Sequence, residues 1–382
     1  MGLLIKKILI IGFMIIFIFG CGKSLIKINA KLDSDPYPMF GRTSARNFFV
    51  PVTVSDSLLL YWENDVHGNF TNSSVTIYDE YVFTSDLGGR IYVFDIYDGS
   101  KVGMLKSKDA IYSAPLIFKS VVVYAVAEEK YNLTELIIYN YKTGKEIFYE
   151  EIYSRVLSEM IALEDGIIFL TESGRINRYD LSGKSIWQTE TDAATRCSPS
   201  LKNEIIIFGN DDGEVITVDL EDGQIINRNS VGGIFTGAPA IDDSIAYMSN
   251  NNGIIYALDL MSTEIIWQHD TGARILMSPA VDDKNVIIGN LSGSLFSLNK
   301  LNGKPNWKQQ YKGVFNATPL LTNYRIIIPD LFRSLYIIDK STGIPNKIYL
   351  LEGRAKLSPV YFDGILFIGF DRGILRAYEF IY

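Results

Sequence analysis

A regular set of aspartates is the feature of this 382-residue sequence that first suggests chemistry. Each follows an apolar run, and carboxylates are ligands that calcium and other hard cations prefer. Their spacings lie close to multiples of 40 residues, so the side chains fall in separate repeats and cannot converge on one ion. Asp also starts turns, because its side chain accepts hydrogen bonds from the amides that follow. We therefore expect turn formation and no metal site from this set, which comprises Asp95, Asp180, Asp219, Asp259 and Asp339.

Four tryptophans recur at one position of the same repeat. Their flat rings could stack on a sugar or a quinone. Their periodic placement instead favours packing of each indole against the next repeat, with its N–H donated to a backbone carbonyl. They are Trp62, Trp187, Trp267 and Trp307.

No arrangement of residues in the sequence is typical of catalysis. His67 and His269 are the only histidines, and no motif links either one to a serine or cysteine as base and nucleophile. Two histidines alone also make a poor metal site. Cys197 has no partner for a disulfide once Cys21 is set aside, and we expect it to be a small core residue. We predict no catalytic residues, no metal and no cofactor.

Prolines at a fixed period indicate the elements that position these residues. Each proline follows a Ser, Ala or Thr, and the last five are 40 residues apart. A period of this length means that one supersecondary unit is repeated. The prolines are Pro115, Pro199, Pro239, Pro279, Pro319 and Pro359.

Each unit is predicted to hold four short strands joined by tight turns that contain Gly, Asn or Asp. The apolar runs are continuous rather than alternating, as in residues 205–208 and 326–328. Such strands are covered on both faces. The blades of a β-propeller meet this condition, because each blade lies between two others.

The unit count predicts an eight-bladed ring. The spacing of 44 residues between Pro115 and Glu159 indicates a longer hairpin near residues 128–135. The last unit ends at Tyr382 after three strands, so residues 58–62 are expected to supply its fourth. The predicted fold is an all-β, eight-bladed β-propeller of four-stranded antiparallel blades over residues 57–382, closed by an N-terminal strand that pairs with the C-terminal blade.

The N-terminus predicts an export signal. Lys6 and Lys7 precede an apolar run over residues 8–20, which is too short to span a bilayer but fits the core of a signal peptide. Residues 18–21 resemble a bacterial lipobox, which implies cleavage before Cys21 and lipid attachment to its thiol. Residues 1–20 would then be a lipoprotein signal peptide, and residues 21–56 a lipid-anchored tether and lead-in. The alternative is a short membrane anchor that is retained uncleaved.

The chain is acidic, with a net charge of −8. Removal of residues 1–20 takes away two lysines and leaves a net charge of −10. General binding of nucleic acid needs a basic face, so this class of function is disfavoured.

A basic cluster stands out against this background. Its members precede the proline positions, so they are expected to gather at one mouth of the central channel, where Glu159 replaces a proline. Such a rim could hold an acidic peptide or a carboxylated ligand. The alternative is solvated charge without a ligand. The predicted rim comprises Arg155, Glu159, Arg196, Arg274, Arg354 and Lys356.

The repeat resembles the pyrroloquinoline-quinone (PQQ) repeat of quinoprotein-dehydrogenase-like propellers. The resemblance rests on residues 253–259 followed by Ile266 and Trp267, on residues 89–95, and on the lead-in at residues 37–42. It covers about residues 37 to 382. One branch of that superfamily is the acylated, eight-bladed, non-catalytic BamB family of outer-membrane β-barrel assembly. The other comprises quinone-dependent dehydrogenases, whose calcium and quinone ligands and paired adjacent cysteines have no counterpart here.

The resemblance implies a non-enzymatic scaffold that binds other proteins of the bacterial cell envelope, in outer-membrane protein assembly. The expected protein is a monomeric propeller, anchored through Cys21 at the outer membrane and facing the periplasm. Two alternatives stay open. One is a PQQ-dependent dehydrogenase-like or quinone-binding sensor protein, and the other is a carbohydrate-binding surface lipoprotein.

Overall fold

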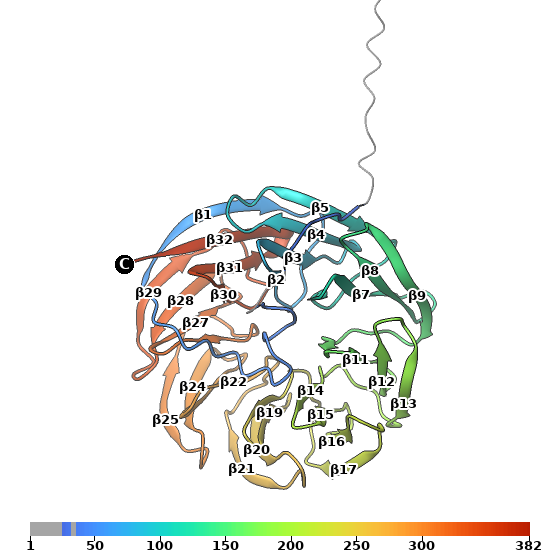
Figure 1. The fold of residues 1–382 in the computed structure, drawn as a ribbon. Coiled ribbons are helices and arrows are strands. Elements are labelled where there is room, and N and C mark those ends of the chain that lie inside the picture. Colours follow the sequence, from blue (N-terminus) through green and yellow to red (C-terminus); the bar gives the residue numbers. More distant parts are fainter. Residues whose placement is uncertain (1–24, 32–35) are drawn as a thin grey trace, which may run out of the picture.

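Eight sheets arranged in a ring make up the protein (Figure 1). The computed structural model describes residues 25–31 and 36–382. Within these residues, the strands form eight sheets of four antiparallel strands each. The predicted eight-bladed propeller is therefore confirmed. We number the blades along the chain and call the first strand of each blade inner and the fourth strand outer.

The first four blades follow the chain order. Blade 1 holds β2 (Thr76–Tyr78), β3 (Tyr81–Ser85), β4 (Arg90–Asp95) and β5 (Lys101–Lys106). Blade 2 holds β6 (Leu116–Phe118), β7 (Val121–Glu128), β8 (Leu133–Asn140) and β9 (Lys145–Tyr153). Blade 3 holds β10 (Ile161–Ala162), β11 (Gly166–Leu170), β12 (Arg175–Asp180) and β13 (Ser185–Glu190). Blade 4 holds β14 (Ser200–Lys202), β15 (Ile205–Gly209), β16 (Glu214–Asp219) and β17 (Ile225–Ser230).

The remaining blades complete the ring. Blade 5 holds β18 (Ala240–Asp242), β19 (Ile245–Ser249), β20 (Ile254–Asp259) and β21 (Ile265–Asp270). Blade 6 holds β22 (Ala280–Val281), β23 (Asn285–Gly289), β24 (Ser294–Asn299) and β25 (Pro305–Gln310). Blade 7 holds β26 (Leu320–Leu321), β27 (Arg325–Pro329), β28 (Ser334–Asp339) and β29 (Pro345–Leu350). Blade 8 holds β30 (Val360–Phe362), β31 (Ile365–Phe370), the short helix η1 (Asp371–Gly373), β32 (Ile374–Ile381) and β1 (Ser57–Asp65).

The core lies between neighbouring blades. All five residues of β15 are buried, as continuous apolar runs predict for a strand covered on both faces. Outer strands such as β21 are mostly exposed. The longer hairpin predicted in blade 2 is also present, since β7 and β8 have eight residues each.

The periodic aspartates start turns, as predicted. The Asp95 carboxylate accepts the amides of Tyr97 at 2.8 Å and Asp98 at 3.2 Å. Asp219, Asp259 and Asp339 make the same pair of bonds, while Asp180 accepts the amides of Ser182 and Lys184. The amide of Ser262 holds the pKa of Asp259 below its usual value. The turns need glycine where they meet a tryptophan, because a Cβ on Gly99 (φ 70°) would lie 2.6 Å from the Trp62 ring.

Each of the four tryptophans joins its own blade to the next one, which confirms the predicted packing role. Trp62 Nε1 donates to the Ile96 carbonyl at 2.8 Å. The same bond links Trp187 to Leu220, Trp267 to Lys300 and Trp307 to Lys340, at 3.0, 2.9 and 3.0 Å.

The predicted closure of the ring is present. β1 pairs antiparallel with β32 from Ser57 opposite Ile381 to Asp65 opposite Ile374. The closing strand is therefore nine residues long and contains the predicted residues 58–62. An N-terminal strand thus completes the C-terminal blade (Figure 1).

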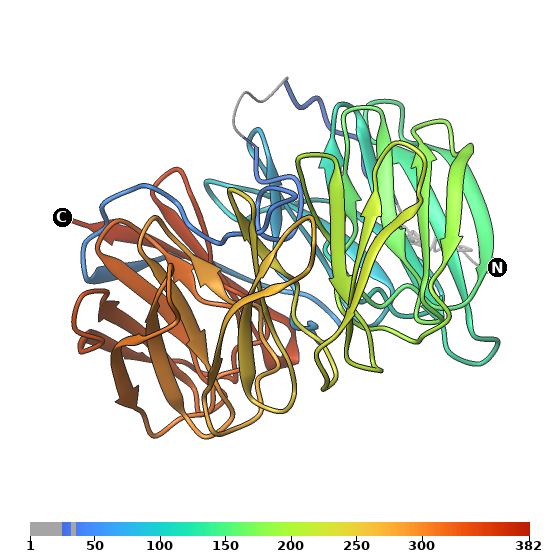
Figure 2. The ribbon, with the colours of Figure 1, turned by 90° about the horizontal axis from the view of Figure 1, so that it is seen from below.

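The lead-in at residues 37–52 runs along the inner strands on one face of the ring (Figure 2). Its carbonyls accept hydrogen bonds of 2.8 to 3.0 Å from inner strands of six blades in turn. The acceptors are Tyr37, Pro38, Ser44, Ala45, Asn47 and Phe48, and the donors are Ile77, Ile117, Leu201, Ile241, Val281 and Leu321. The sequence predicted only that this segment belongs to the tether and lead-in. Its path along the inner strands was not predicted.

The predicted signal peptide and Cys21 lie outside the described residues. In the part of the chain that the structure does describe, no helix has the length and apolar character needed to cross a membrane.

Trp62→Ala tests closure of the ring by β1. The indole is 7% exposed and packs against Phe94 and Phe367 at centroid distances of 6.2 and 5.8 Å. Its loss should destabilise the fold by about 3–5 kcal/mol, the usual effect of truncating a buried large aromatic, and lower the melting temperature. Tyr61→Ala, an exposed neighbour on the same strand, is the control and should change little. Equal melting temperatures for the two variants would contradict the closure.

Candidate functional site

The predicted rim lies on the face of the ring that carries the connections between blades, and we call it the rim face. Three of its arginines form ion pairs with carboxylates in the turn between the second and third strands of the same blade. The pairs are Arg155–Glu172 at 2.7 Å, Arg196–Asp211 at 3.1 Å and Arg354–Asp371 at 3.0 Å. Exposed pairs of this kind contribute little to stability. They nevertheless neutralise much of the charge expected at the rim.

A central cavity of about 310 Å³ opens between the inner strands of the ring. Of the predicted rim residues, Arg196 and Glu159 line it, whereas Arg155, Arg274, Arg354 and Lys356 do not. Half of the other lining residues are Ser, Thr or Asn, and the rest are Gly or apolar and aromatic residues such as Leu157, Met277 and Phe40 of the lead-in. The six predicted residues therefore do not converge on one pocket.

The lead-in places Arg46 in the centre of the ring. Its side chain is fully buried, and Nη2 donates to the carbonyls of Glu159 at 3.3 Å and Met160 at 3.0 Å. The guanidinium also lies 5.6 Å from the centroid of the Phe40 ring. Nε and Nη1 have no hydrogen-bond partner among the described residues. Arg46 thus supplies the contact to blade 3 from inside the ring.

Glu159 is buried rather than exposed at the rim. Its Oε2 accepts the Ala114 amide at 2.9 Å, across the boundary between blades 2 and 3. Burial raises the pKa of Glu159 to about 7, against the opposing effects of the positive charge of Arg46 and the Ala114 amide. The prediction that Glu159 joins the rim is therefore wrong in position. Its carboxylate links two blades at the wall of the cavity.

Hydroxyl groups make the same kind of link at other blade boundaries. Ser278 Oγ accepts the Ala238 amide at 2.8 Å, and Ser198 Oγ accepts the Glu159 amide at 3.0 Å. Thr318 and Ser358 continue the series at 3.3 and 3.2 Å. Four of the six prolines follow a Ser or Thr, and the hydroxyl of each of these residues connects adjacent blades around the channel.

The residues around this cavity do not fit a calcium–quinone cofactor. Calcium takes six to eight oxygen ligands, several of them carboxylates. Among the described residues that line the cavity, Glu159 is the sole carboxylate, and it already accepts the Ala114 amide. Buried Arg46 adds positive charge nearby, which opposes a cation. In the described part of the chain, no three His, Cys, Asp or Glu side chains cluster as metal ligands.

Cys197 precedes the cavity-lining residue Ser198 and is a buried free thiol, as predicted. Its Sγ contacts the Gly237 carbonyl oxygen at 3.1 Å and accepts the Gly209 amide at 3.3 Å. Burial raises the pKa of Cys197 to about 12, so the thiol stays protonated and unreactive at neutral pH.

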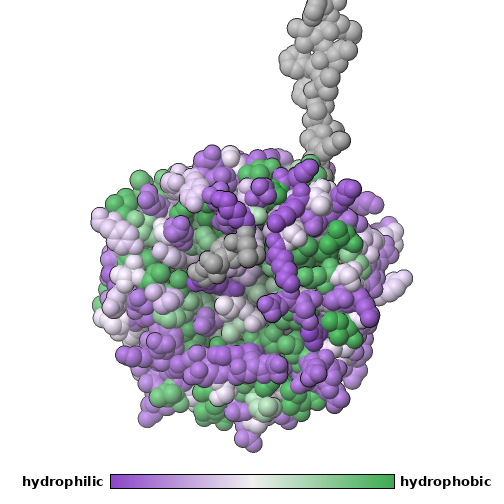
Figure 3. Space-filling view, in the orientation of Figure 1, coloured by the Kyte–Doolittle hydropathy of each residue, from purple (hydrophilic) through white to green (hydrophobic). Residues whose placement is uncertain are grey.

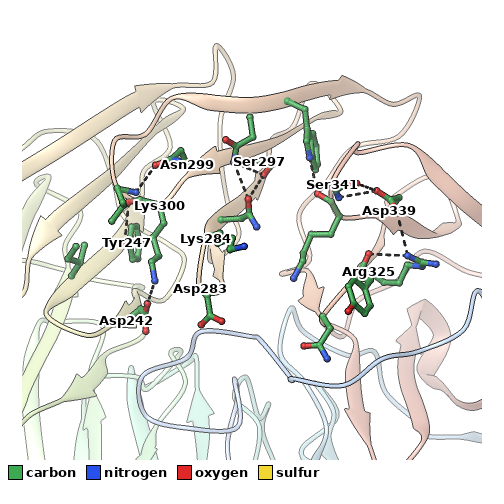
Figure 4. A pocket seen from close by; sticks show the side chains of 18 of the residues that line it. Asp242, Tyr247, Asp283, Lys284, Ser297, Asn299, Lys300, Arg325, Asp339 and Ser341 are labelled. Atoms are coloured by element: carbon green, nitrogen blue, oxygen red, sulfur yellow. Dashed lines mark hydrogen bonds and ion pairs between the residues drawn. The ribbon is translucent and has the colours of Figure 1, made fainter.

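A larger groove of about 730 Å³ crosses blades 5, 6 and 7 beside the lead-in (Figure 4). It lies on the face that carries the turns between first and second strands, which we call the turn face. Tyr247 and Trp307 contribute aromatic surface, and Tyr324 and Leu301 project at 61% and 74% exposure. Sequence reasoning missed this groove, because its residues come from turns of three separate repeats.

Ion pairs between blades shape the groove. Lys300 pairs with Asp242, and Lys340 pairs with Asp282 at 2.6 Å. Burial tends to raise the pKa of Asp282, but the hydrogen bonds from Lys340 and from the Lys284 amide hold it below its usual value. Lys300 and Lys340 are thus already paired, while Leu301 and Tyr324 are open to contact.

The chain matches one family model along most of its length. The model of the family described as outer membrane protein assembly factor BamB matches residues 119–253 and 251–378. These segments extend from blade 2 to blade 8. No protein with a curated description matches the sequence significantly.

Solved structures share the architecture. BamB from Moraxella catarrhalis is 18% identical, with a TM-score of 0.72 over 85% of this chain and 100% of that chain. The quinohemoprotein alcohol dehydrogenase ADHIIG from Pseudomonas putida is 11% identical, with a TM-score of 0.76 over 91% of this chain and 80% of that chain. The quinohemoprotein alcohol dehydrogenase from Comamonas testosteroni is 10% identical, with a TM-score of 0.74 over 90% and 80%. At such identities these similarities establish the fold alone.

The buried Glu159 should make stability depend on pH. Its pKa is about 7 in the fold and near 4.5 when unfolded, so the stabilisation is complete below pH 4.5 and is lost as pH rises through 7. The free energy of unfolding should fall by up to roughly 3 kcal/mol between pH 5 and pH 8, measured by urea denaturation. Glu159→Gln should remove this slope, whereas the exposed control Glu221→Gln should keep it. The same slope in both variants would refute the assignment.

Proposed function

We propose, because the chain belongs to the family described as outer membrane protein assembly factor BamB, that it is a non-enzymatic scaffold that docks envelope proteins during outer-membrane protein assembly. The observation that carries the proposal is the family match from blade 2 to blade 8. The central cavity supports it. Ser198 and Ser278 in its wall are engaged in links between blades, and its single carboxylate among the described lining residues is held by an amide.

The groove on the turn face supports a docking role. Protein-binding sites combine exposed aromatic and aliphatic side chains with a charged surround. Tyr324 and Leu301 provide the exposed aromatic and aliphatic side chains. The paired Lys300 and Lys340 provide the charged surround. The groove is open along three blades, which suits an extended polypeptide better than a small reacting molecule.

We also propose that the protein is a lipoprotein attached to the outer membrane and facing the periplasm. Cys21 is the attachment point, after removal of residues 1–20. This placement accords with the net charge of −10 in the mature chain, which keeps a soluble ring from adsorbing to anionic surfaces over most of its area.

Cys21→Ala tests the anchor. The variant should retain its signal segment or leave the membrane fraction, because the thiol that receives the lipid is gone. Metabolic labelling with radioactive palmitate should mark the wild-type protein and not the variant. Cys197→Ala is the control and should be labelled like the wild type. Palmitate incorporated into Cys21→Ala would exclude this anchor.

Deletion of the gene in its host tests the docking function. The amounts of folded β-barrel proteins in the outer membrane should fall, while inner-membrane proteins stay constant. Wild-type protein should restore them, and a Leu301→Ala/Tyr324→Ala variant should restore them less well. Tyr97→Ala, an exposed aromatic in a turn of blade 1, is the matched control and should restore them fully. Unchanged barrel proteins in the deletion strain would exclude the proposal.

A direct assay tests the absence of enzymatic activity. Purified protein mixed with PQQ and calcium should neither bind the quinone saturably nor reduce a dye with alcohols or sugars. Arg46 and the single cavity carboxylate among the described residues disfavour the calcium that such catalysis requires. Stoichiometric, calcium-dependent binding would instead favour a dehydrogenase.

A further inference from the structure

A short segment ahead of the lead-in is fixed in the seam between blades 1 and 2. Leu25 forms an isolated antiparallel bridge with Met104 on β5, and its carbonyl accepts the Met104 amide at 3.3 Å. Ile26 is fully buried. Its amide donates to Tyr139 Oη at 3.2 Å, and that hydroxyl donates back to the Ile26 carbonyl at 2.9 Å. Residues 25 and 26, which follow Cys21 closely, are therefore part of the fold.

Blade 1 has room for this segment because its outer strand lacks a tryptophan. Gly103 occupies the register position that Trp267 has in blade 5. A Cβ on Gly103 would lie 3.0 Å from the Leu25 carbonyl oxygen and 3.2 Å from Ile26 Cα, so a side chain as large as tryptophan there would need the space that the segment occupies. Ile26 fills the space that an indole fills elsewhere.

The backbone of the segment also replaces the indole hydrogen bond. The Ile28 amide donates to the Tyr141 carbonyl at 3.0 Å. Tyr141 lies three residues before the turn glycine Gly144, just as Lys300, which accepts the Trp267 indole, lies three residues before Gly303. The seam between blades 1 and 2 is thus built to receive this part of the chain.

The position of Leu25 limits where the membrane can be. Leu25 lies on the outer strand β5, at the outer edge of the ring (Figure 1). Leu25 is four positions after Cys21, and a chain of that length reaches roughly 14 Å at most. A lipid on Cys21 therefore holds the edge of blades 1 and 2 near the bilayer, whatever path the three residues between them take.

Lysines surround this point of the ring. They lie on the segment itself, on β5, and on either side of Gly144, which contacts Leu25. All are exposed, and the described residues offer none of them an ion-pair partner within 4.0 Å. Asp98 and Glu146 lie close to them in the sequence, and the outer strand β9 also carries Glu150 and Glu151. The four lysines are Lys27, Lys101, Lys142 and Lys145.

We propose that the outer edge of blades 1 and 2 rests on the membrane, with these four lysines against anionic lipid headgroups. The proposal rests on the lipid anchor at Cys21 given above. Lysines near a membrane are attracted to anionic headgroups, so the cluster would orient a ring that the lipid already anchors. The ring then stands on its edge. Its rim face and turn face both stay open to the periplasm, and the groove on blades 5 to 7 points away from the bilayer.

Fluorescence quenching in vesicles tests this orientation. Acylated full-length protein is purified from membranes with a cysteine introduced at Ser100, in the turn before β5, or at Ser262, in the corresponding turn of blade 5 across the ring. Each cysteine carries an environment-sensitive fluorophore, and wild-type protein checks that buried Cys197 takes up no label. The vesicles contain phosphatidylethanolamine and phosphatidylglycerol with a headgroup nitroxide. Quenching should be at least twofold stronger at position 100 than at position 262.

Two variants separate the contributions of the seam and the lysines. Gly103→Trp fills the seam as tryptophan does in blades 3, 5, 6 and 8 and should expel the segment, so that the two positions are quenched equally while the lipid content stays the same. Replacement of the four lysines by glutamine should lower the contrast in anionic vesicles at low salt. Near-native circular dichroism of both variants shows that the ring still forms.

The outcomes distinguish the two proposals. Lipid on the purified protein together with stronger quenching at position 100 supports the edge-on orientation. Lipid with equal quenching at both positions, or with stronger quenching at position 262, overturns the orientation and leaves the anchor standing. Protein without lipid, shown by its intact mass, overturns both.

Discussion

The whole ring depends on one stretch of chain, residues 37–65, that touches every blade. A propeller must join its first and last blades, because an open ring would expose sheet edges and two apolar blade faces. The outer part of the stretch does this as β1, which pairs with β32. The inner part crosses the other inner strands by backbone bonds, such as Ser44 to Leu201 and Asn47 to Val281. Closure and central packing are thus two effects of the same segment.

The lead-in contacts blade 3 differently from its neighbours, and this difference accounts for the buried charge of Arg46. In the described residues the lead-in gives backbone bonds to the inner strands of blades 1, 2 and 4 to 7, while Arg46 reaches blade 3 with its side chain. Burying a guanidinium is costly, and removal of a partner from such a site usually destabilises more than the pair contributes. Glu159 lies beside it and replaces the proline of the repeat. A carboxylate here both offsets the charge of Arg46 and binds the Ala114 amide.

The period of the sequence was sufficient to predict the blades, their number and the closing strand. Those features follow from local rules that each repeat obeys, such as Asp259 at a turn and Trp267 against the next blade. The path of the lead-in was not predictable in the same way, because its partners are one residue from each blade and it has no period of its own. Glu159 was assigned to an exposed rim, since charge alone does not show that Arg46, 113 residues earlier, is buried near it. The groove was missed because Tyr247, Trp307 and Tyr324 meet only in the closed ring.

In a repeat protein, the residues that depart from the repeat are therefore the ones that distinguish this chain from any other ring of the same blades. A residue that obeys the period is explained by the packing of one blade on another, and it would be present in a ring without any partner. Gly103 breaks the period where the N-terminal segment enters, and Glu159 breaks it where Arg46 is buried. Both exceptions receive part of the same chain, the segment before β1. The groove on blades 5 to 7 has no such occupant among the described residues, since Leu301 and Tyr324 stay exposed beside the lead-in. In the docking function proposed above, a segment of another protein would take that place.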